Sequence, residues 1–148
     1  MKVVLQRVKH AQVSVENRII GKINQGYLLL VGFEDSDTET QLDYVVHKIC
    51  HLRIFEDENQ KMNLDIQQVG GSILSVSQFT LYASTRHGNR PSFTAAGDPD
   101  HAKRCFARFN EKLKQTEIPL ATGEFGANMQ VDLQNDGPVT IILDTDQL

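Results

Sequence analysis

The sequence predicts an α+β fold in which a mostly antiparallel, β-barrel-like sheet is accompanied by two main helices. Many short segments are β-branched or alternate in hydropathy, and only two segments carry an apolar stripe at helical spacing. These helices and strands do not alternate strictly along the chain, as they would in a parallel α/β sheet. The length of 148 residues is that of one domain, which we expect to span residues 1–148.

Most of the predicted elements are strands. Residues 3–8 and 11–15 are β-branched and bounded by polar residues, which predicts a hairpin of two strands. A polar turn at 56–61 and the Gly70-Gly71 pair interrupt the following pattern, and Asn135-Asp136-Gly137-Pro138 predicts a turn near the end. Further strands are predicted over residues 26–33, 52–55, 72–76, 129–133 and 139–143.

Both predicted helices have recognisable starts. The first follows the capping residues 35–38 and runs to Cys50, with apolar residues three and four positions apart. The second runs from about Asp98 to Gln115, because Asp98 suits the N-cap and the proline after it suits the first helical position. Cys50 and Cys105 fall within the apolar stripes and form no C-x-x-C pair, so we expect small core residues in a reducing compartment.

Composition excludes several classes of protein. A hydrophobic fraction of 40%, a charged fraction of 23% and a mean hydropathy of −0.33 are ordinary for globular chains and exclude disorder and fibrous architecture. The longest apolar run, Tyr27–Val31, is far shorter than the roughly 18–20 residues that cross a bilayer. No signal-peptide pattern is present, so the sequence predicts a cytoplasmic protein without a membrane partner.

The net charge of −4 argues against binding nucleic acid over the whole surface. The charge is uneven, however, because residues 84–114 carry seven Lys or Arg against three acidic residues. This basic segment has two interpretations. It is either a solvated helix face balanced by acids elsewhere, or a local phosphate-binding patch of the kind that RNA-binding proteins carry.

Several familiar catalytic motifs are absent. The sequence has no phosphate-binding P-loop, no dinucleotide-binding glycine motif and no H-E-x-x-H zinc motif, and residues 70–74 lack the last glycine of a nucleophile elbow. His47 and His51 are four residues apart and could direct two imidazoles at one metal ion, with Cys50 between them. Because the pair lies where the helix ends, interaction of histidine with a helix C-terminus is the more economical explanation. We expect no metal and no other cofactor.

Two polar segments are candidates for a site. Residues 77–82 place hydroxyl and amide groups at the end of a predicted strand, where such groups either make local hydrogen bonds or act on a ligand. No histidine or acid lies near in sequence to activate a hydroxyl, so a Ser-His-Asp triad would need a distant partner. The Gly137-Pro138 step is either an ordinary trans turn or, if cis, a pair of carbonyls directed at an ammonium group.

Taken together, Ser77-Gln78-Phe79-Thr80-Leu81 and Asn135-Asp136-Gly137-Pro138-Val139-Thr140 resemble the signature pair of the D-aminoacyl-tRNA deacylases. The resemblance covers essentially the whole chain and includes Leu5-Gln6-Arg7-Val8 and Arg90-Pro91-Ser92-Phe93. Two residues depart from the usual pattern and concern local turn geometry: Gln60 stands where relatives usually have glycine, and Asn128 where they usually have aspartate.

The resemblance implies a homodimer with an active site at the dimer interface, which hydrolyses the ester joining a D-amino acid to the 3′-terminal adenosine of tRNA. The Gly137-Pro138 bond would be cis and would reach into the partner's pocket, where its carbonyls hold the α-ammonium. An L-side chain would then clash with protein, whereas a D-side chain would point to solvent. Glycine has no side chain to reject, so glycine mischarged on tRNA(Ala) is expected as a second substrate.

The resemblance also assigns roles to single residues. The catalytic set is Ser77, Gln78, Phe79 and Thr80, and the substrate-binding set is Gly137, Pro138, Met129, Phe125 and Arg7. We expect amides around Phe79 and Thr80 to stabilise the oxyanion, Met129 and Phe125 to line the apolar part, and Arg7 to brace the Gly-Pro segment. A Thr80 nucleophile without a base is weak, so assistance by the tRNA 2′-hydroxyl is the favoured mechanism.

Two alternative functions remain open at this point. The chain could be a non-catalytic module that binds tRNA through its basic segment, or a metal-dependent hydrolase that uses His47 and His51. The expected partners are a second copy of the chain and aminoacyl-tRNA, and neither DNA nor a membrane is expected.

Overall fold

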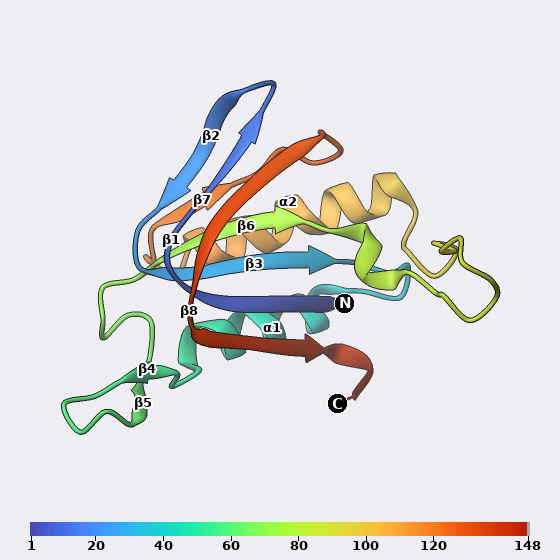
Figure 1. Ribbon diagram of the computed structural model, residues 1–148. Coiled ribbons are helices and arrows are strands. Elements are labelled where there is room, and N and C mark those ends of the chain that lie inside the picture. The colour runs from blue at the N-terminus through green and yellow to red at the C-terminus, as the bar shows by residue number, and fades with distance from the viewer. Residues whose placement is uncertain (148) are drawn as a thin grey trace.

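The computed structural model describes residues 1–147 (Figure 1). Its helices are α1 (Glu39–His51), α2 (Pro99–Lys114) and the 3-10 helices η1 (Phe79–Tyr82) and η2 (Thr145–Gln147). Its strands are β1 (Lys2–Val15), β2 (Arg18–Ile23), β3 (Gly26–Gly32), β4 (Phe55–Glu56), β5 (Met62–Leu64), β6 (Ser72–Ser77), β7 (Leu120–Thr122) and β8 (Met129–Asp144).

A six-stranded sheet curls around the molecule in the order β2-β1-β3-β6-β7, with β8 on the other side of β1. β1 is antiparallel to β2, β3 and β8, whereas β3–β6 and β6–β7 are parallel pairs. β4 and β5 form a separate two-stranded sheet. The predicted α+β class with a barrel-like sheet and two main helices is therefore confirmed, although the sheet is mixed.

The predicted hairpin of residues 3–8 and 11–15 is wrong, because both segments belong to the continuous strand β1. The polar residues Lys9 and His10 between them are exposed but do not turn the chain, since the backbone there continues to pair with β8. The actual hairpin joins β1 to β2 through Glu16 and Asn17, which both have positive φ angles (50° and 63°). Two such residues in succession are typical of a type I′ turn.

The end of the chain differs from prediction in the same way. The two strands predicted at 129–133 and 139–143 are one strand, β8, and its pairing with β1 shifts register beside the predicted turn at 135–138. Of the strand predicted at 52–55, only Phe55 lies in a strand, because Leu52 ends helix α1 as its C-cap.

The helices begin where their capping residues predict. The Gln41 side chain accepts a hydrogen bond from the Thr38 N–H (2.9 Å), which closes a capping box at the start of α1. Asp98 caps α2 by accepting hydrogen bonds from the amides of Asp100 (3.1 Å) and His101 (3.2 Å). None of the helices in residues 1–147 is long and apolar enough to cross a membrane.

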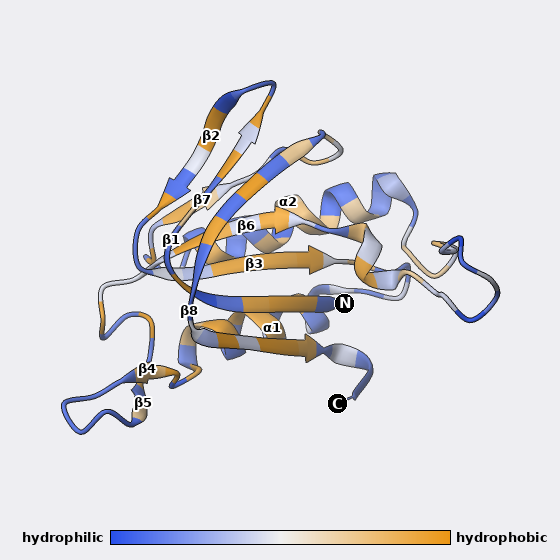
Figure 2. Cartoon of the chain, viewed as in Figure 1, coloured by the Kyte–Doolittle hydropathy of each residue, from blue (hydrophilic) through white to orange (hydrophobic). Residues whose placement is uncertain are grey.

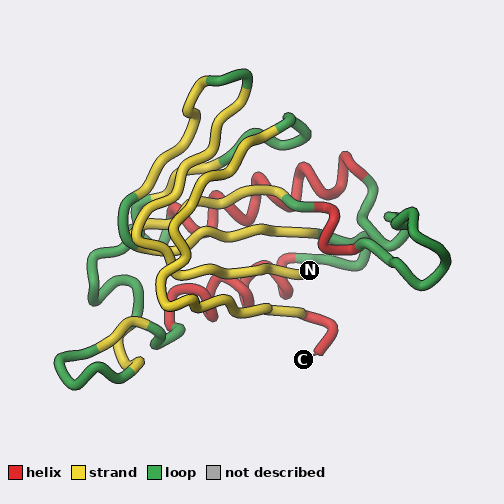
Figure 3. Tube along the Cα trace, in the orientation of Figure 1, coloured by secondary structure: helices red, strands yellow, loops and turns green. Residues whose placement is uncertain are grey.

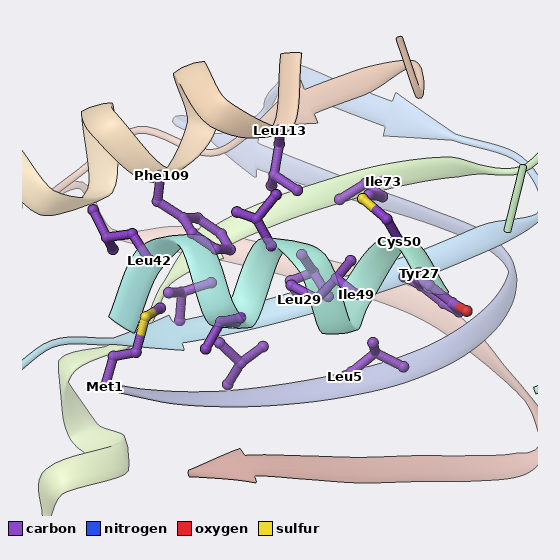
Figure 4. Packing of buried hydrophobic residues seen from close by; sticks show 14 of the residues in the cluster. Met1, Leu5, Tyr27, Leu29, Leu42, Ile49, Cys50, Ile73, Phe109 and Leu113 are labelled. Atoms are coloured by element: carbon purple, nitrogen blue, oxygen red, sulfur yellow. The ribbon is translucent and has the colours of Figure 1, made fainter. Parts of the chain in front are cut away.

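Two apolar clusters occupy the two faces of the sheet. Tyr27 and Leu29 of β3 contribute to the larger cluster, which α1 and α2 cover (Figure 4). Leu28, which points the opposite way on the same strand, belongs to the smaller cluster enclosed by the curl of β1, β2 and β8. Figure 2 shows the matching hydropathy, with β3 largely apolar and β8 alternating.

Cys50 and Cys105 are free and buried, as predicted from the apolar stripes. Burial raises the pKa of both thiols, so each is a weakly reactive core group.

Candidate functional site

A cavity of about 590 Å³ lies at the end of the sheet where β3 and β6 finish. Its walls come from these strand ends, from η1, from the segment before α2, from the first turn of α2, and from the segment after β7. The lining residues are Val31, Gly32, Phe33, Asp35, Ser77, Gln78, Phe79, Phe93, Thr94, Ala96, Gly97, Asp98, Pro99, Ala102, Phe125 and Gly126. Most of them are apolar, and the predicted residues Ser77, Gln78, Phe79 and Phe125 are among them.

The rim segment is fixed by the end of β3. The Gln78 N–H donates a hydrogen bond to the Val31 carbonyl (2.7 Å), so η1 starts directly against the neighbouring strand. A Cβ at Gly32 would lie 2.9 Å from the Gln78 carbonyl oxygen. Since real Cβ atoms almost never come this close to backbone, only glycine allows η1 this position.

The first two backbone N–H groups of η1 have no hydrogen-bond acceptor within this short helix. The first hydrogen bond of η1 runs from the Leu81 N–H to the Gln78 carbonyl (3.2 Å). The N–H groups of Phe79 and Thr80 therefore precede the first helical bond and have no carbonyl within η1 to donate to. The Gln78 side-chain amide donates to the Thr80 hydroxyl, which orients both groups.

Aromatic side chains form two sides of the cavity. Phe79 is 57% exposed and meets the 36% exposed Phe93 edge to face, with ring centroids 5.2 Å apart. Phe125 packs against Phe106 of α2 at 6.1 Å. The cavity thus offers apolar, partly exposed surface beside the polar groups of η1.

The cavity wall formed by the segment before α2 is hydrogen-bonded to the residues that follow β3. The Gly97 N–H donates to the Phe33 carbonyl (2.9 Å), and the Asp98 N–H donates to the Asp35 carboxylate (2.7 Å). Because Asp98 also caps α2, the strand end, the connecting segment and the helix start are held as one unit. The Asp98 cap was predicted from the residues around it. The contribution of Asp35 to the cavity was not, since the two residues are far apart in sequence.

The Gly137–Pro138 peptide bond is cis, and Gly137 has a φ of +123°, a conformation that favours glycine. The Asn135 side-chain amide closes the base of this segment by donating to the carbonyls of Arg7 and Val139, both at 3.0 Å. Asn135, at the start of the Gly-Pro motif, is thus a positioning residue whose role was not predicted from the sequence.

Arg7 is buried beside the Gly-Pro segment. Its guanidinium donates to the carbonyls of Ile54 (2.5 Å) and Asp136 (3.3 Å), and its Nε lies 3.4 Å from the Asp136 carboxylate. The structure therefore places Arg7 against the segment that it was expected to brace.

Within one chain, the two signature segments lie at opposite ends of the sheet. Arg7 pairs with Tyr27 of β3, which pairs with Ile73 of β6, whereas Ser77 pairs with Val31 at the far end of the same strands. Arg7, Gly137 and Pro138 do not line the cavity. Met129 does not line the cavity either; it packs against the smaller apolar cluster, and its sulfur lies close to Gly123.

The pair His47 and His51 lies at the end of α1. Their rings stack with centroids 4.3 Å apart, and His51 Nδ1 is 2.8 Å from the His47 carbonyl oxygen. This contact with a terminal carbonyl fits the helix-end interpretation. Within residues 1–147, no group of three or more His, Cys, Asp or Glu side chains is arranged to hold a metal ion.

Comparison with known proteins decides the family. The model of the family described as D-Tyr-tRNA(Tyr) deacylase matches residues 4–144. The chain belongs to this family. The D-aminoacyl-tRNA deacylases of two Limosilactobacillus reuteri strains, DSM 20016 and JCM 1112, are each 59% identical to it over 142 residues, which is 96% of this chain and 98% of theirs. The predicted family and the prediction of a hydrolase that acts as a D-aminoacyl-tRNA deacylase are confirmed.

Two solved structures share the fold. One is described as c-Myc DNA Unwinding Element Binding Protein, with a TM-score of 0.91 and 42% identity over 98% of this chain and 99% of that one. The other is described as a probable eukaryotic D-amino acid tRNA deacylase, with a TM-score of 0.80 and 17% identity over 96% of this chain and 97% of that one. The second likeness concerns the fold alone.

Proposed function

We propose that this chain works as a cytoplasmic homodimer that removes D-amino acids from tRNA and leaves L-aminoacyl-tRNA intact. The observation that carries the proposal is the position of residues 77–79 at the rim of an apolar cavity, in a chain 59% identical to D-aminoacyl-tRNA deacylases. An apolar cavity with a short polar segment at its rim suits an aminoacyl-adenosine ester, because such a substrate has both apolar rings and polar groups to be bound.

A second copy of the chain would complete the pocket. The Gly137–Pro138 segment and the cavity lie apart in one chain, so the segment acts on the cavity of the partner. β8 carries the segment and, within residues 1–147, pairs only with β1, which leaves its other edge open. Ile142 on this strand is 69% exposed, which favours coverage by another protein surface.

The enzyme would distinguish D- from L-aminoacyl esters by sterically excluding the L-side chain. The carbonyls of Gly137 and Pro138 accept hydrogen bonds from the α-ammonium, and the ester carbonyl is held by the amides at Phe79 and Thr80. With these two points fixed, the side chain of a D-residue projects to solvent and that of an L-residue meets protein. Glycine passes the same filter, so the enzyme also removes glycine mischarged on tRNA(Ala).

The hydrolysis itself needs one water molecule. Water attacks the ester carbonyl carbon, the bond to the ribose 3′-oxygen breaks, and a proton returns to that oxygen, which yields the free amino acid and tRNA. The amides at Phe79 and Thr80 stabilise the negative charge on the carbonyl oxygen. The adjacent 2′-hydroxyl of the substrate assists the attack, since the Thr80 hydroxyl is engaged by Gln78 and has no base beside it in sequence.

The first experiment compares hydrolysis of D-tyrosyl-tRNA and L-tyrosyl-tRNA by the purified protein, with and without EDTA. We expect loss of the D-ester alone, unaffected by EDTA. Loss of neither ester with measurable tRNA binding would favour a non-catalytic binding module. Equal loss of both would refute the chirality filter, and inhibition by EDTA would favour a metal-dependent enzyme.

A subunit-mixing experiment tests the shared site. A Gln78→Ala chain that has lost activity supplies an intact Gly-Pro segment, and a Gly137→Val chain that has lost activity supplies an intact cavity. Random mixing makes half of the dimers mixed, each with one complete site, so about a quarter of the wild-type activity should return. No recovery, with mixed dimers present by mass spectrometry, would refute the exchange between subunits.

A further inference from the structure

A basic loop projects from the molecule next to the cavity. It comprises residues 84–92 between η1 and α2, and it extends beyond the end of the sheet where β3 and β6 finish (Figures 1 and 3). A bridge between Ser84 and Ser92 closes it, with N–H to carbonyl distances of 2.8 and 2.9 Å. Arg86 and Arg90 are exposed within the loop, which contains no acidic residue.

Two of the five basic residues in the rest of the segment, both on α2, are paired with acidic side chains. Arg108 of α2 pairs with Glu39 (3.0 Å) and Glu111 (2.9 Å), and Lys112 pairs with Glu39 (2.7 Å) and Asp43 (2.5 Å). That part of the segment is the solvated helix face that the sequence analysis had left as one interpretation. Neither arginine of the basic loop forms an ion pair with any of residues 1–147, so the loop carries uncompensated positive charge.

The loop is joined to the cavity rim by aromatic contact. Phe93 follows the closing bridge directly, lines the cavity and packs against Phe79 at 5.2 Å. A chain whose end enters the cavity therefore passes close to the two arginines. The net charge of the whole protein is −4, so this loop is a local positive feature on a protein of net negative charge.

We propose that Arg86 and Arg90 bind backbone phosphates of the RNA strand whose 3′-terminal residue enters the cavity. This inference rests on the proposed function, because that function puts an RNA end in the cavity. Guanidinium groups form paired hydrogen bonds with phosphate oxygens, and phosphate contacts position a nucleic acid without reading its sequence. The loop is thus a positioning element that serves every tRNA alike.

The test is the salt dependence of KM for D-tyrosyl-tRNA in the wild type and in the double variant Arg86→Gln/Arg90→Gln. Each single-strand phosphate contact contributes about 0.7 to the slope of log affinity against log salt. Two contacts make the wild type lose about sevenfold more affinity than the variant between 50 and 200 mM salt. The matched control is Arg18→Gln/Lys61→Gln, which removes two exposed charges from β2 and from the β4–β5 connection at the other side of the molecule.

A phosphate-free substrate separates phosphate binding from a structural role. The ratio of kcat/KM on D-tyrosyl-tRNA to that on 3′-D-tyrosyl-adenosine should fall about tenfold or more at low salt in the glutamine variant, and stay at the wild-type value in the control. The variant Arg86→Lys/Arg90→Lys, which keeps both charges, should recover most of the salt slope.

The outcomes are distinct. If the wild type hydrolyses the D-ester and the glutamine variant keeps the wild-type salt slope and substrate ratio, the phosphate assignment is wrong. If the variant loses kcat equally on both substrates, the loop shapes the cavity instead, and the assignment is again overturned. If the wild type hydrolyses neither substrate, the proposed function itself has failed.

Discussion

Thr80 is the residue whose substitution best separates the two possible mechanisms of ester hydrolysis. Its hydroxyl accepts a hydrogen bond from the Gln78 side chain, and the residue is exposed at the start of η1. Replacing Thr80 by alanine removes this one hydrogen bond and leaves the Thr80 backbone amide in place. A single neutral hydrogen bond contributes about 0.5–1.5 kcal/mol, which corresponds to a rate loss of about 2–12-fold.

The rate loss would be much larger if the Thr80 hydroxyl were the nucleophile. Removing the attacking group of a covalent mechanism costs about 10³-fold or more, or about 4 kcal/mol. The assay is single-turnover hydrolysis of D-tyrosyl-tRNA with enzyme in excess, so that product release does not limit the rate. A loss of about 10³-fold in Thr80→Ala, with circular dichroism and thermal midpoint unchanged, would refute substrate assistance by the 2′-hydroxyl.

Two further predictions concern stability. Arg7→Met keeps the side-chain length but leaves the buried carbonyl of Ile54 and the partly buried carbonyl of Asp136 without their donor, so urea unfolding should show a loss of at least about 1–3 kcal/mol, the cost of one buried carbonyl; an unchanged unfolding midpoint would contradict the bracing role. Hydrogen bonds from Arg108 and then Lys112 hold the pKa of the Glu39 carboxyl below its ordinary value, so its contribution to stability is present above the unfolded pKa and is lost as the pH falls through the folded one. The wild type should therefore melt above Glu39→Gln at pH 7, and the gap between the two melting temperatures should shrink as the pH falls below the ordinary glutamate pKa of 4.5, whereas a gap that does not shrink would contradict this account.

Local signals predicted the helices well. Apolar spacing and capping chemistry placed α2 to within a residue at either end, because the Asp98 cap and the proline after it act on the backbone next to them. The strands were less predictable, since the polar pair Lys9-His10 has the composition of a turn. What keeps β1 extended there is pairing with β8, more than a hundred residues away, and no local pattern records such pairing.

In the candidate site, too, local features could be predicted from the sequence, whereas contacts between distant segments could not. Residues 77–80 were found because they follow an apolar strand. The structure places Ser77, Gln78 and Phe79 at a cavity, and Thr80 is hydrogen-bonded to Gln78 without lining the cavity itself. The link between Asp35 and Asp98, and the need for glycine at position 32, depend on how separate segments approach, so neither could be derived from spacing. The proposed exchange between subunits came from family resemblance, because the distance between the two motifs only becomes visible in the folded chain.

The central position of β1 has a consequence for how the chain folds. Its partners include β8, and the register joins Lys2 to Asp144, so the sheet has a high contact order. Such pairings are slow to form, because a long loop must close before any of them contributes stability. During synthesis, one whole edge of β1 therefore stays open until the last strand has left the ribosome, and in that interval the nascent chain depends on protection from other open strand edges.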